Sequence, residues 1–451
     1  MIRKEIEQLS ENCKHIFEEV SDCIWATPET NYTEEKSTEA QRKVMEELGF
    51  KIIPVPDMPT AFVAEAGSGK PVIAILGEHD ALPNLSAEAD IPEWKEIVHD
   101  GPGHGCGHNL LGAGAMESAY ILWQYMQAHN LQGTVKFCAC PAEEGGVGKV
   151  YMIHRGVFDD VDFTISWHPG AKFGITHKCK SIAISNFKWH GKSAHAAGNP
   201  QHGRSALDAM ELTNVGIQFL REHVDKETYI HYSILNGGGP APNVVQSSAM
   251  GQYVVRCKDN TELVDTFRRV VLCAKGAATM TETTLEEPTI LSAFSSMIDN
   301  EVMADILRKN IEAIKPVSYT DEEIAYAKQF QAIGSNPDAE DAICQELDET
   351  GAGSTDVADV SWVTPLIYLR VPTLANGTIG HHWTVTAQGK GPVAKKGLHI
   401  AARLMADTCI DMLEDPSLIE AAKEEFKKQL KGKKYEEECL IPKTQMPCAI
   451  Y

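Results

Sequence analysis

Apolar and polar positions change along the chain in a way that separates helices from strands. Helical spacing of apolar residues covers residues 36–48 and 110–129, whereas short apolar runs such as "VIAIL", Val72 to Leu76, are typical of buried strands. Further strands are expected at "GTVKFCAC" and "DFTISWHP". Alternating helices and strands predict an α/β fold with a central sheet. Ligands of such sheets bind beyond the carboxyl ends of the strands, so polar residues there are candidates for chemistry.

The pattern changes after about residue 180. A strand, "SIAISNFKWHG", precedes a helix, two further strands, a second helix and a last strand, "TETTLEEPTI". This β-α-β-β-α-β order describes a compact unit that can bury a core of its own. We therefore predict an inserted domain at residues 181–294, and a second domain formed by residues 1–180 and 295–451.

Composition places limits on partners and location. The chain has 451 residues, which is too many for one ordinary core, and a net charge of −22, which disfavours nucleic acid and anionic membranes. Its apolar runs are too short to span a bilayer. The first twenty residues form an amphipathic pattern interrupted by charges, unlike a signal peptide. Twelve cysteines without a secretion signal predict reduced thiols in the cytoplasm.

The stretch "GPGHGCGHN" brings a thiol and imidazoles into one glycine-rich loop. Cys106 and His108 stand two residues apart, and the flanking glycines allow both side chains to converge on one point. Thiolate and imidazole are good zinc ligands. The pair alone leaves three interpretations open: metal ligands, a cysteine nucleophile with its base, or a buried structural thiol.

Other polar groups follow apolar strands. "CPAEEGG" carries Glu143 and Glu144, whose mutual repulsion a bound dication would relieve, although a lone Glu–Glu pair is more often an exposed turn. Single histidines such as His168 are more often structural than ligands. Taken together, the groups match the needs of a two-metal hydrolytic centre. They are Asp80 in "GEHDALP", Cys106, His108, Glu143, Glu144, His168 in "TISWHPG", and His381 or His382 in "TIGHHWTVTAQG".

At this point the motifs resemble a known family. "HGCGHN", "PAEE" and "GKSAHAA" at 191–197 are similar to motifs of the aminoacylase/carboxypeptidase family of metal-dependent peptidases, in its amidohydrolase branch. The similar stretches run in order from about residue 77 to 389. The resemblance implies a catalytic domain with a central mixed sheet flanked by helices, and an inserted ferredoxin-like lid that also mediates dimerisation.

The resemblance also implies a role for each matching residue. The metal ligands would be Cys106, His108, Glu144, His168 and His381, holding one or two divalent ions, zinc or manganese, with cobalt as an alternative. Glu143 matches the general base, and Asp80 the carboxylate that orients a ligand histidine. In the inserted domain, His195 matches the residue that polarises the scissile carbonyl. Asn243 and Arg256 match substrate-binding positions, although a structural ion pair explains Arg256 equally well.

Two positions depart from the family pattern. Asn109 stands where the branch often has Asp, and adjacent His381 and His382 replace a single histidine; alignment on Trp383 selects His381. His104 matches the motif, but we expect it to shape the loop rather than bind metal.

The predicted activity is hydrolysis of the amide bond of N-acyl amino acids or dipeptides, with p-aminobenzoyl-glutamate-like substrates favoured. The resemblance implies a homodimer formed through the lid, or a complex with a partner subunit. Two other functions stay open: a non-catalytic or partner-dependent binding subunit on the same fold, and a cysteine hydrolase that uses Cys106. The latter leaves Glu143, Glu144 and His168 unexplained.

Overall fold

The computed structural model describes residues 3–351 and 353–447, which divide into two units. The first contains the described residues up to Lys178, the described residues between Met297 and Lys433, and residues 446–447. The second contains Cys179–Ser296 and also Lys434–Gln445, a segment near the end of the chain.

The first unit is built on an eight-stranded sheet in the order β1-β2-β4-β3-β5-β13-β6-β12. Strands β3, β4, β5 and β13 are mutually parallel, and the β1–β2, β2–β4 and β6–β13 pairs are antiparallel, so the sheet is mixed. Its strands are β1 (Lys51–Val55), β2 (Met58–Ser68), β3 (Val72–Glu78), β4 (Gly133–Cys140), β5 (Phe163–Gly170), β6 (Phe173–Ile175), β12 (Leu347–Asp348) and β13 (Leu366–Pro372).

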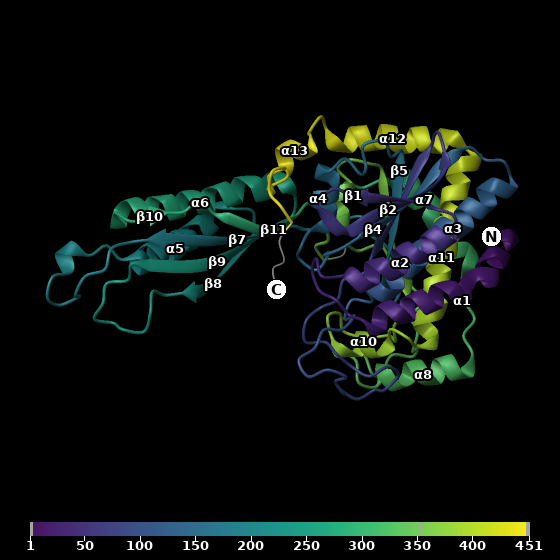
Figure 1. The fold of residues 1–451 in the computed structure, drawn as a ribbon, viewed down its shortest axis with the longest axis horizontal. Coiled ribbons are helices and arrows are strands. Elements are labelled where there is room, and N and C mark those ends of the chain that lie inside the picture. The colour runs from purple at the N-terminus through teal and green to yellow at the C-terminus, as the bar shows by residue number, and fades with distance from the viewer. Residues whose placement is uncertain (1–2, 352, 448–451) are drawn as a thin grey trace. The chain divides into compact units, whose positions relative to one another are not determined.

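Helices flank this sheet (Figure 1). Helices α3 and α11 pack against each other and against the central strands, and α1 packs on both. The helices of this unit are α1 (Lys4–Ala26), α2 (Glu35–Glu47), α3 (His108–Ala128), α4 (Gly148–His154), α7 (Glu301–Ile314), α8 (Asp321–Gln331), α9 (Val357–Val360), α10 (Trp383–Gln388), α11 (Pro392–Glu414) and α12 (Pro416–Leu430). The predicted α/β fold is confirmed.

The central strands are apolar along their whole length, because they are covered on both faces. Every residue of β3 and of β4 is buried. The parallel strands end at the same edge of the sheet. Asp80 follows the end of β3, Glu143 follows the end of β4, and His168 lies near the end of β5. The topology therefore collects the predicted polar groups at one edge.

The second unit contains a five-stranded antiparallel sheet in which β7 pairs with β9, β10 and β11, and β8 lies at one edge. The last strand expected from the sequence is divided into two strands in the structure, with residues 286–288 between them. Pro288 lies in this gap, and proline has no N–H to donate to a neighbouring strand. The elements are β7 (Ser181–His190), η1 (Pro200–His202), α5 (Ala206–Leu220), η2 (Arg221–His223), β8 (Tyr229–Asn236), β9 (Ser248–Cys257), α6 (Asn260–Thr281), β10 (Thr284–Leu285), β11 (Thr289–Phe294) and α13 (Tyr435–Glu438).

The described helices include none that is both long enough and apolar enough to cross a membrane. The cysteines within the described residues are all free thiols.

Candidate metal centre and active site

The loop before α3 places Cys106 and His108 at the edge of the sheet. Gly107 between them has a φ of +78°, and a side chain there would press on Pro169 at 3.0 Å, so glycine suits the position. His108 is the first residue of α3 and lies fully buried. Its Nδ1 donates to Asp80 Oδ1 at 2.9 Å, which leaves Nε2 directed at the neighbouring ligand groups.

Asp80 serves two partners at once. Its second oxygen, Oδ2, accepts a hydrogen bond from the backbone N–H of Glu144 at 2.9 Å. Burial opposes its ionisation, but the charge and hydrogen bond of His108 lower the pKa of Asp80 to about 2. The ionised Asp80 carboxylate therefore connects the His108 ring to the turn that carries Glu144.

The predicted ligands form two groups that share Cys106. One is Cys106, His108 and His168, and the other is Cys106, Glu144 and His381; in each, the ligand atoms all lie within 4.8 Å of one another. Cys106 Sγ is 3.3 Å from His168 Nε2, and Glu144 Oε2 is 3.5 Å from His381 Nε2. Two ligands of one tetrahedral ion, with bonds of ~2.0–2.3 Å, stand about 3.3–3.7 Å apart. The measured spacing would suit one or two divalent ions held by these residues, with Cys106 common to both groups.

The chemistry of the donors also fits divalent ions. Burial and the charge of Glu144 raise the pKa of the Cys106 thiol, and burial raises the pKa of Glu144. His108 Nε2 and Glu144 Oε1 are buried and make no hydrogen bond in the described structure; their nearest charged contacts are Glu78 Oε2, 3.2 Å from His108 Nε2, and each other, at 4.0 Å. Buried carboxyl and thiol groups that repel one another when ionised are stabilised by a cation.

Glu143 lies beside these groups without belonging to either of the two. A carboxylate oxygen of Glu143 is within 4.8 Å of a carboxylate oxygen of Glu78 and of a ring nitrogen of His108. Burial and the neighbouring carboxylates Glu78 and Glu144 raise the pKa of Glu143 well above its usual value. A carboxylate with a raised pKa at the edge of a metal centre is suited to accept a proton and to return it.

Sequence reasoning missed an ion network behind the centre. The Lys149 ammonium, on α4, lies 2.6 Å from Glu78 Oε1 and 2.6 Å from Asp356 Oδ1, and all three side chains are fully buried. Glu78 Oε2 in turn lies 3.2 Å from His108 Nε2. A lysine inside an otherwise apolar short helix was the one local signal that could have drawn attention to it.

The structure distinguishes the two adjacent histidines. His381, with a φ of +53°, directs Nε2 toward Glu144, whereas His382 Nδ1 accepts from the backbone N–H of Thr384 at the start of α10. His104 is buried, and its Nε2 contacts the carbonyl of Ile24 at 3.1 Å, away from the ligand groups. The geometry therefore brings His381 to the centre.

Asn109, at a position where the family often has Asp, makes hydrogen bonds that hold neighbouring segments together. Its amide nitrogen donates to Ser21 Oγ and to the carbonyl of Gly389, each at 3.0 Å, and the residue is fully buried. The Asn side chain thus ties the start of α3 to α1 and to the end of α10.

His195 and Asn243 lie together in the second unit. His195 pairs with Val244 in an isolated bridge, and the Asn243 carbonyl accepts from Ala196 N at 3.0 Å. His195 Nδ1 accepts from the backbone N–H of Gly198 at 3.0 Å. An acceptor at Nδ1 places the ring hydrogen on Nε2. His195 therefore offers an exposed N–H donor.

Arg256 is not near these two residues within the second unit. Ser248, at the start of β9, pairs with His190, the residue that ends β7 before the His195 loop. Arg256 stands eight residues further along β9, which at ~3.3 Å per residue puts it ~26 Å along the strand from Ser248. Among the described residues, no carboxylate forms an ion pair with Arg256. The alternative role of Arg256, a structural ion pair, therefore has no partner within the described structure.

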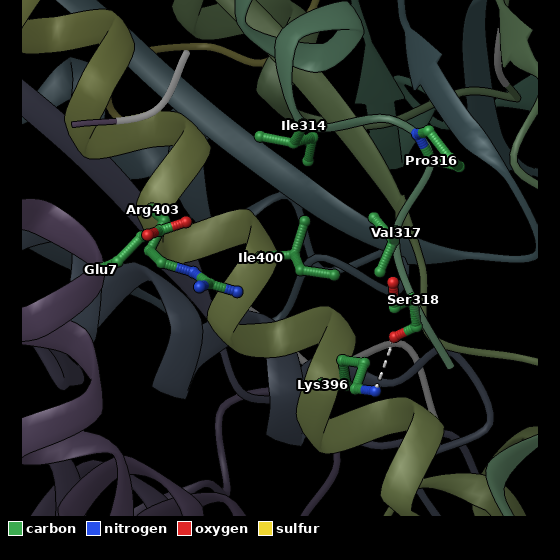
Figure 2. Close-up of a pocket in the computed structure, with 8 residues that line it drawn as sticks. All are labelled: Glu7, Ile314, Pro316, Val317, Ser318, Lys396, Ile400 and Arg403. Carbon is green, nitrogen blue, oxygen red and sulfur yellow. Dashed lines mark hydrogen bonds between the residues drawn. The ribbon is translucent and has the colours of Figure 1, made fainter. Parts of the chain in front are cut away.

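A separate pocket of about 240 Å³ lies beside α11 in the first unit (Figure 2). Lys396 Nζ donates to the carbonyl of Ser318 across it at 3.0 Å. None of the predicted site residues lines this pocket, so we assign it no part in the chemistry. Its lining is Glu7, Ile314, Pro316, Val317, Ser318, Lys396, Ile400 and Arg403.

Comparison with known proteins identifies the family. Residues 74–443 match the model of peptidase family M20/M25/M40. One subunit of p-aminobenzoyl-glutamate hydrolase from Escherichia coli (strain K12), the one designated B, is 36% identical, over 96% of this chain and 95% of that protein. The Xaa-Arg dipeptidase of Mus musculus is 27% identical, over 91% and 89%.

Solved structures share the fold. An aminobenzoyl-glutamate utilization protein from Klebsiella pneumoniae aligns with a TM-score of 0.64 at 17% identity, covering 91% of this chain and 98% of that one. A dinuclear metal-binding peptidase of the M20 family from Bacillus subtilis aligns with a TM-score of 0.59 at 20% identity, covering 89% and 99%. The family predicted from the motifs is thus confirmed, and the chain is a hydrolase that belongs to peptidase family M20/M25/M40.

Proposed function

We propose that this chain is a metal-dependent amidohydrolase that cleaves N-acyl amino acids or dipeptides, with p-aminobenzoyl-glutamate-like compounds as favoured substrates. The observation that carries the proposal is the convergence of Cys106, His108, Glu144, His168 and His381 beside Glu143. The substrate class is supported by the p-aminobenzoyl-glutamate hydrolase relative, which matches nearly the whole chain.

The proposed mechanism divides the work between the centre and Glu143. What bound divalent ions supply is Lewis-acid polarisation of a carbonyl oxygen and acidification of water. Glu143 takes the proton from the attacking water and later delivers it to the leaving amine. Burial and the neighbouring Glu78 and Glu144 raise the pKa of Glu143 well above its usual value, which suits a group that takes up a proton and passes it on.

His195 is the proposed donor to the oxyanion of the tetrahedral intermediate. Its Nδ1 is engaged by the backbone N–H groups of Ala197 and Gly198, so Nε2–H is the free donor. Loss of one such donor lowers kcat by about 100- to 1000-fold in comparable hydrolases. Asn243, in the turn just before Val244, the bridge partner of His195, is proposed to contact the substrate beside it.

Arg256 is proposed to recognise a substrate carboxylate. Arg256 lies near the end of β9, whereas the His195 loop lies near its start. Arg256 and His195 of the same chain would therefore not contact the same substrate molecule. An Arg256→Gln variant that raises KM only for substrates with a free carboxylate supports this role. An equal loss for all substrates contradicts it.

Assembly through the second unit is part of the proposal. Strand β8 is an edge strand whose exposed side chains include Tyr229, Tyr232, Ile234 and Leu235. Unpaired apolar edge strands favour pairing with another chain. Because the Escherichia coli relative is named as one subunit of its enzyme, a heteromeric partner is the alternative to a homodimer. The predicted location is the cytoplasm, which agrees with free thiols in the described residues.

A hydrolysis screen tests the function. Purified chain is incubated with p-aminobenzoyl-glutamate, other N-acyl amino acids and dipeptides, with zinc, manganese or cobalt added. We expect turnover that a chelator abolishes and added metal restores. Turnover that survives removal of the metal would instead support a cysteine hydrolase. Bound metal without turnover, alone or with a partner chain, would support a binding function.

A Glu143→Gln variant tests the base. We expect it to bind metal as the wild type does and to lose nearly all turnover, because the amide cannot accept the proton. Full activity with metal bound would contradict the assignment of Glu143.

A further inference from the structure

The turn between β4 and α4 carries Glu143 and Glu144 on an unusual backbone. Ala142 and Val147 have φ angles of +55° and +54°, a region that residues with a side chain rarely adopt, and both are fully buried. Gly145 is also left-handed, with a φ of +96°. A turn of this kind persists only where surrounding groups hold it.

The segment between α1 and α2 supplies such groups. Glu34 Oε1 accepts a hydrogen bond from the backbone N–H of Ala142 at 2.9 Å. Asn31 Nδ2 donates to the carbonyl of Glu144 at 3.3 Å, and Tyr32 Oη donates to the carbonyl of Gly146 at 2.5 Å. Three residues of one short segment thus reach three backbone groups of the turn, more than a hundred positions away in sequence.

Glu34 completes an arrangement around the proposed general base. The N–H before Glu143, on Ala142, is held by Glu34, and the N–H after it, on Glu144, is held by Asp80. Carboxyl groups therefore hold two peptides of the turn, Pro141–Ala142 through Glu34 and Glu143–Glu144 through Asp80. The Ala142 N–H has no other acceptor in the described structure, so Glu34 is the group that satisfies this buried donor.

We propose that Glu34 is a positioning residue for hydrolysis: through Ala142 N it holds the turn in the conformation that aims Glu143 at substrate and Glu144 at the metal centre. The inference rests on the proposed function for its kinetic readout. Displacement of a catalytic group by about 1 Å can lower the rate by about 100-fold.

Three variants and one matched control test the role. Glu34→Ala removes the acceptor, and Glu34→Gln keeps an acceptor oxygen of the same shape. Ala142→Gly removes the Cβ that makes the left-handed conformation unfavourable, so it should reduce the need for Glu34. The control is Glu29→Ala, because Glu29 lies in the same segment but caps α2 by accepting from Lys36 N and Ser37 N.

At saturating metal, we expect Glu34→Ala to lower kcat about 100-fold and KM to change less than about threefold. Glu34→Gln should stay within about tenfold of wild type, and Glu29→Ala within about threefold. Adding Ala142→Gly to Glu34→Ala should restore kcat at least tenfold. A kcat of Glu34→Ala within threefold of wild type overturns the proposal, and so does a double variant no better than Glu34→Ala.

A purely structural role would lower stability without this rescue. If Glu34→Ala does not fold, the comparison of Glu34→Gln with Glu34→Gln/Ala142→Gly replaces it, with any deficit of the former expected to be recovered in the latter. A Glu34→Gln deficit that Ala142→Gly does not recover overturns the proposal.

A metal-binding measurement separates this inference from the proposed function. If wild-type protein hydrolyses no substrate in the screen, the function fails, and the dissociation constant for cobalt, followed by the absorbance of the Cys106 thiolate complex, becomes the readout. Glu34→Ala should then weaken cobalt binding by at least tenfold, because Glu144 is displaced with the turn. Binding equal to wild type overturns the positioning role even in that case.

Discussion

Replacing Lys149 tests whether its buried ammonium stabilises the fold by compensating the charge of the buried carboxylates Glu78 and Asp356. Its ammonium contacts Glu78 and Asp356 at 2.6 Å each, and the three side chains have no exposed surface. At an effective dielectric constant of ~20, each contact corresponds to about 6 kcal/mol of attraction before the cost of burial. Replacing Lys149 with methionine fills a similar volume but leaves two buried carboxylates without their cation.

The expected loss follows from measured buried pairs. Removing one partner of such a pair lowers the free energy of unfolding by about 3–5 kcal/mol. Part of this is offset, because burial already raises the pKa of Asp356 to about 7, so it can take up a proton. With an unfolding entropy of ~2.1 cal/mol/K per residue, the first unit of about 310 described residues should lose ~5–8 °C in Tm.

The control is Lys136→Met on β4. Lys136 makes an ion pair with Asp160 at 2.6 Å, but Asp160 is 55% exposed, so the loss should stay below about 1 kcal/mol. Thermal scans of both variants are run in chelator, since bound metal would stabilise the folded state by mass action. The reasoning is refuted if Lys149→Met lowers Tm no more than Lys136→Met does. A Glu78→Gln/Lys149→Met double variant should recover part of the loss.

Three further outcomes are expected. Dialysis against a chelator should reduce amide hydrolysis at least 100-fold, and zinc, manganese or cobalt should restore it; unaffected activity would exclude metal dependence. His381→Ala should weaken metal binding measured by calorimetry, whereas His382→Ala should leave it within about threefold, and the reverse order would exchange the two assignments. Burial opposes the charge on His399, but hydrogen bonds to Glu117 and Glu18 raise its pKa. The stabilisation from a raised histidine pKa is complete below pH ~6.5 and is lost as pH rises through the folded value. His399→Gln should therefore lose more stability at pH 5.5 than at pH 9 in urea unfolding, and equal losses would contradict the ion pair.

The sequence pattern was informative about which candidate side chains the structure brings together, because several of them follow apolar strands. Glu143 and Glu144 come directly after an apolar strand and His168 lies near the end of another, and parallel strands bring such ends to one edge. The α/β fold followed from the same alternation. His381 needed the resemblance, since nothing local distinguishes it from His382.

Residues that act through long-range contacts could not be found this way. Glu34 looks like one more charge before a helix, and its partner Ala142 is an ordinary residue until its φ is known. Lys149 and Asp356 are 207 positions apart, and neither has a local pattern that specifies the other. Placement of Lys434–Gln445 with the second unit likewise depends on tertiary packing rather than on periodicity.

The balance of charge connects the buried residues that sequence patterns did not reveal, such as Lys149 and Asp356, with the proposed metal ligands. Six carboxyl groups lie buried around the turn: Glu34, Glu78, Asp80, Glu143, Glu144 and Asp356. In the described structure, the buried basic groups that contact them are Lys149 and His108, so the carboxyl groups outnumber the cations that face them. The excess favours binding of divalent cations by the free donors of Cys106, Glu144 and the histidines. Burial and the same neighbouring carboxyl groups raise the pKa of Glu143, so the proposed base and the proposed ligands share one electrostatic environment.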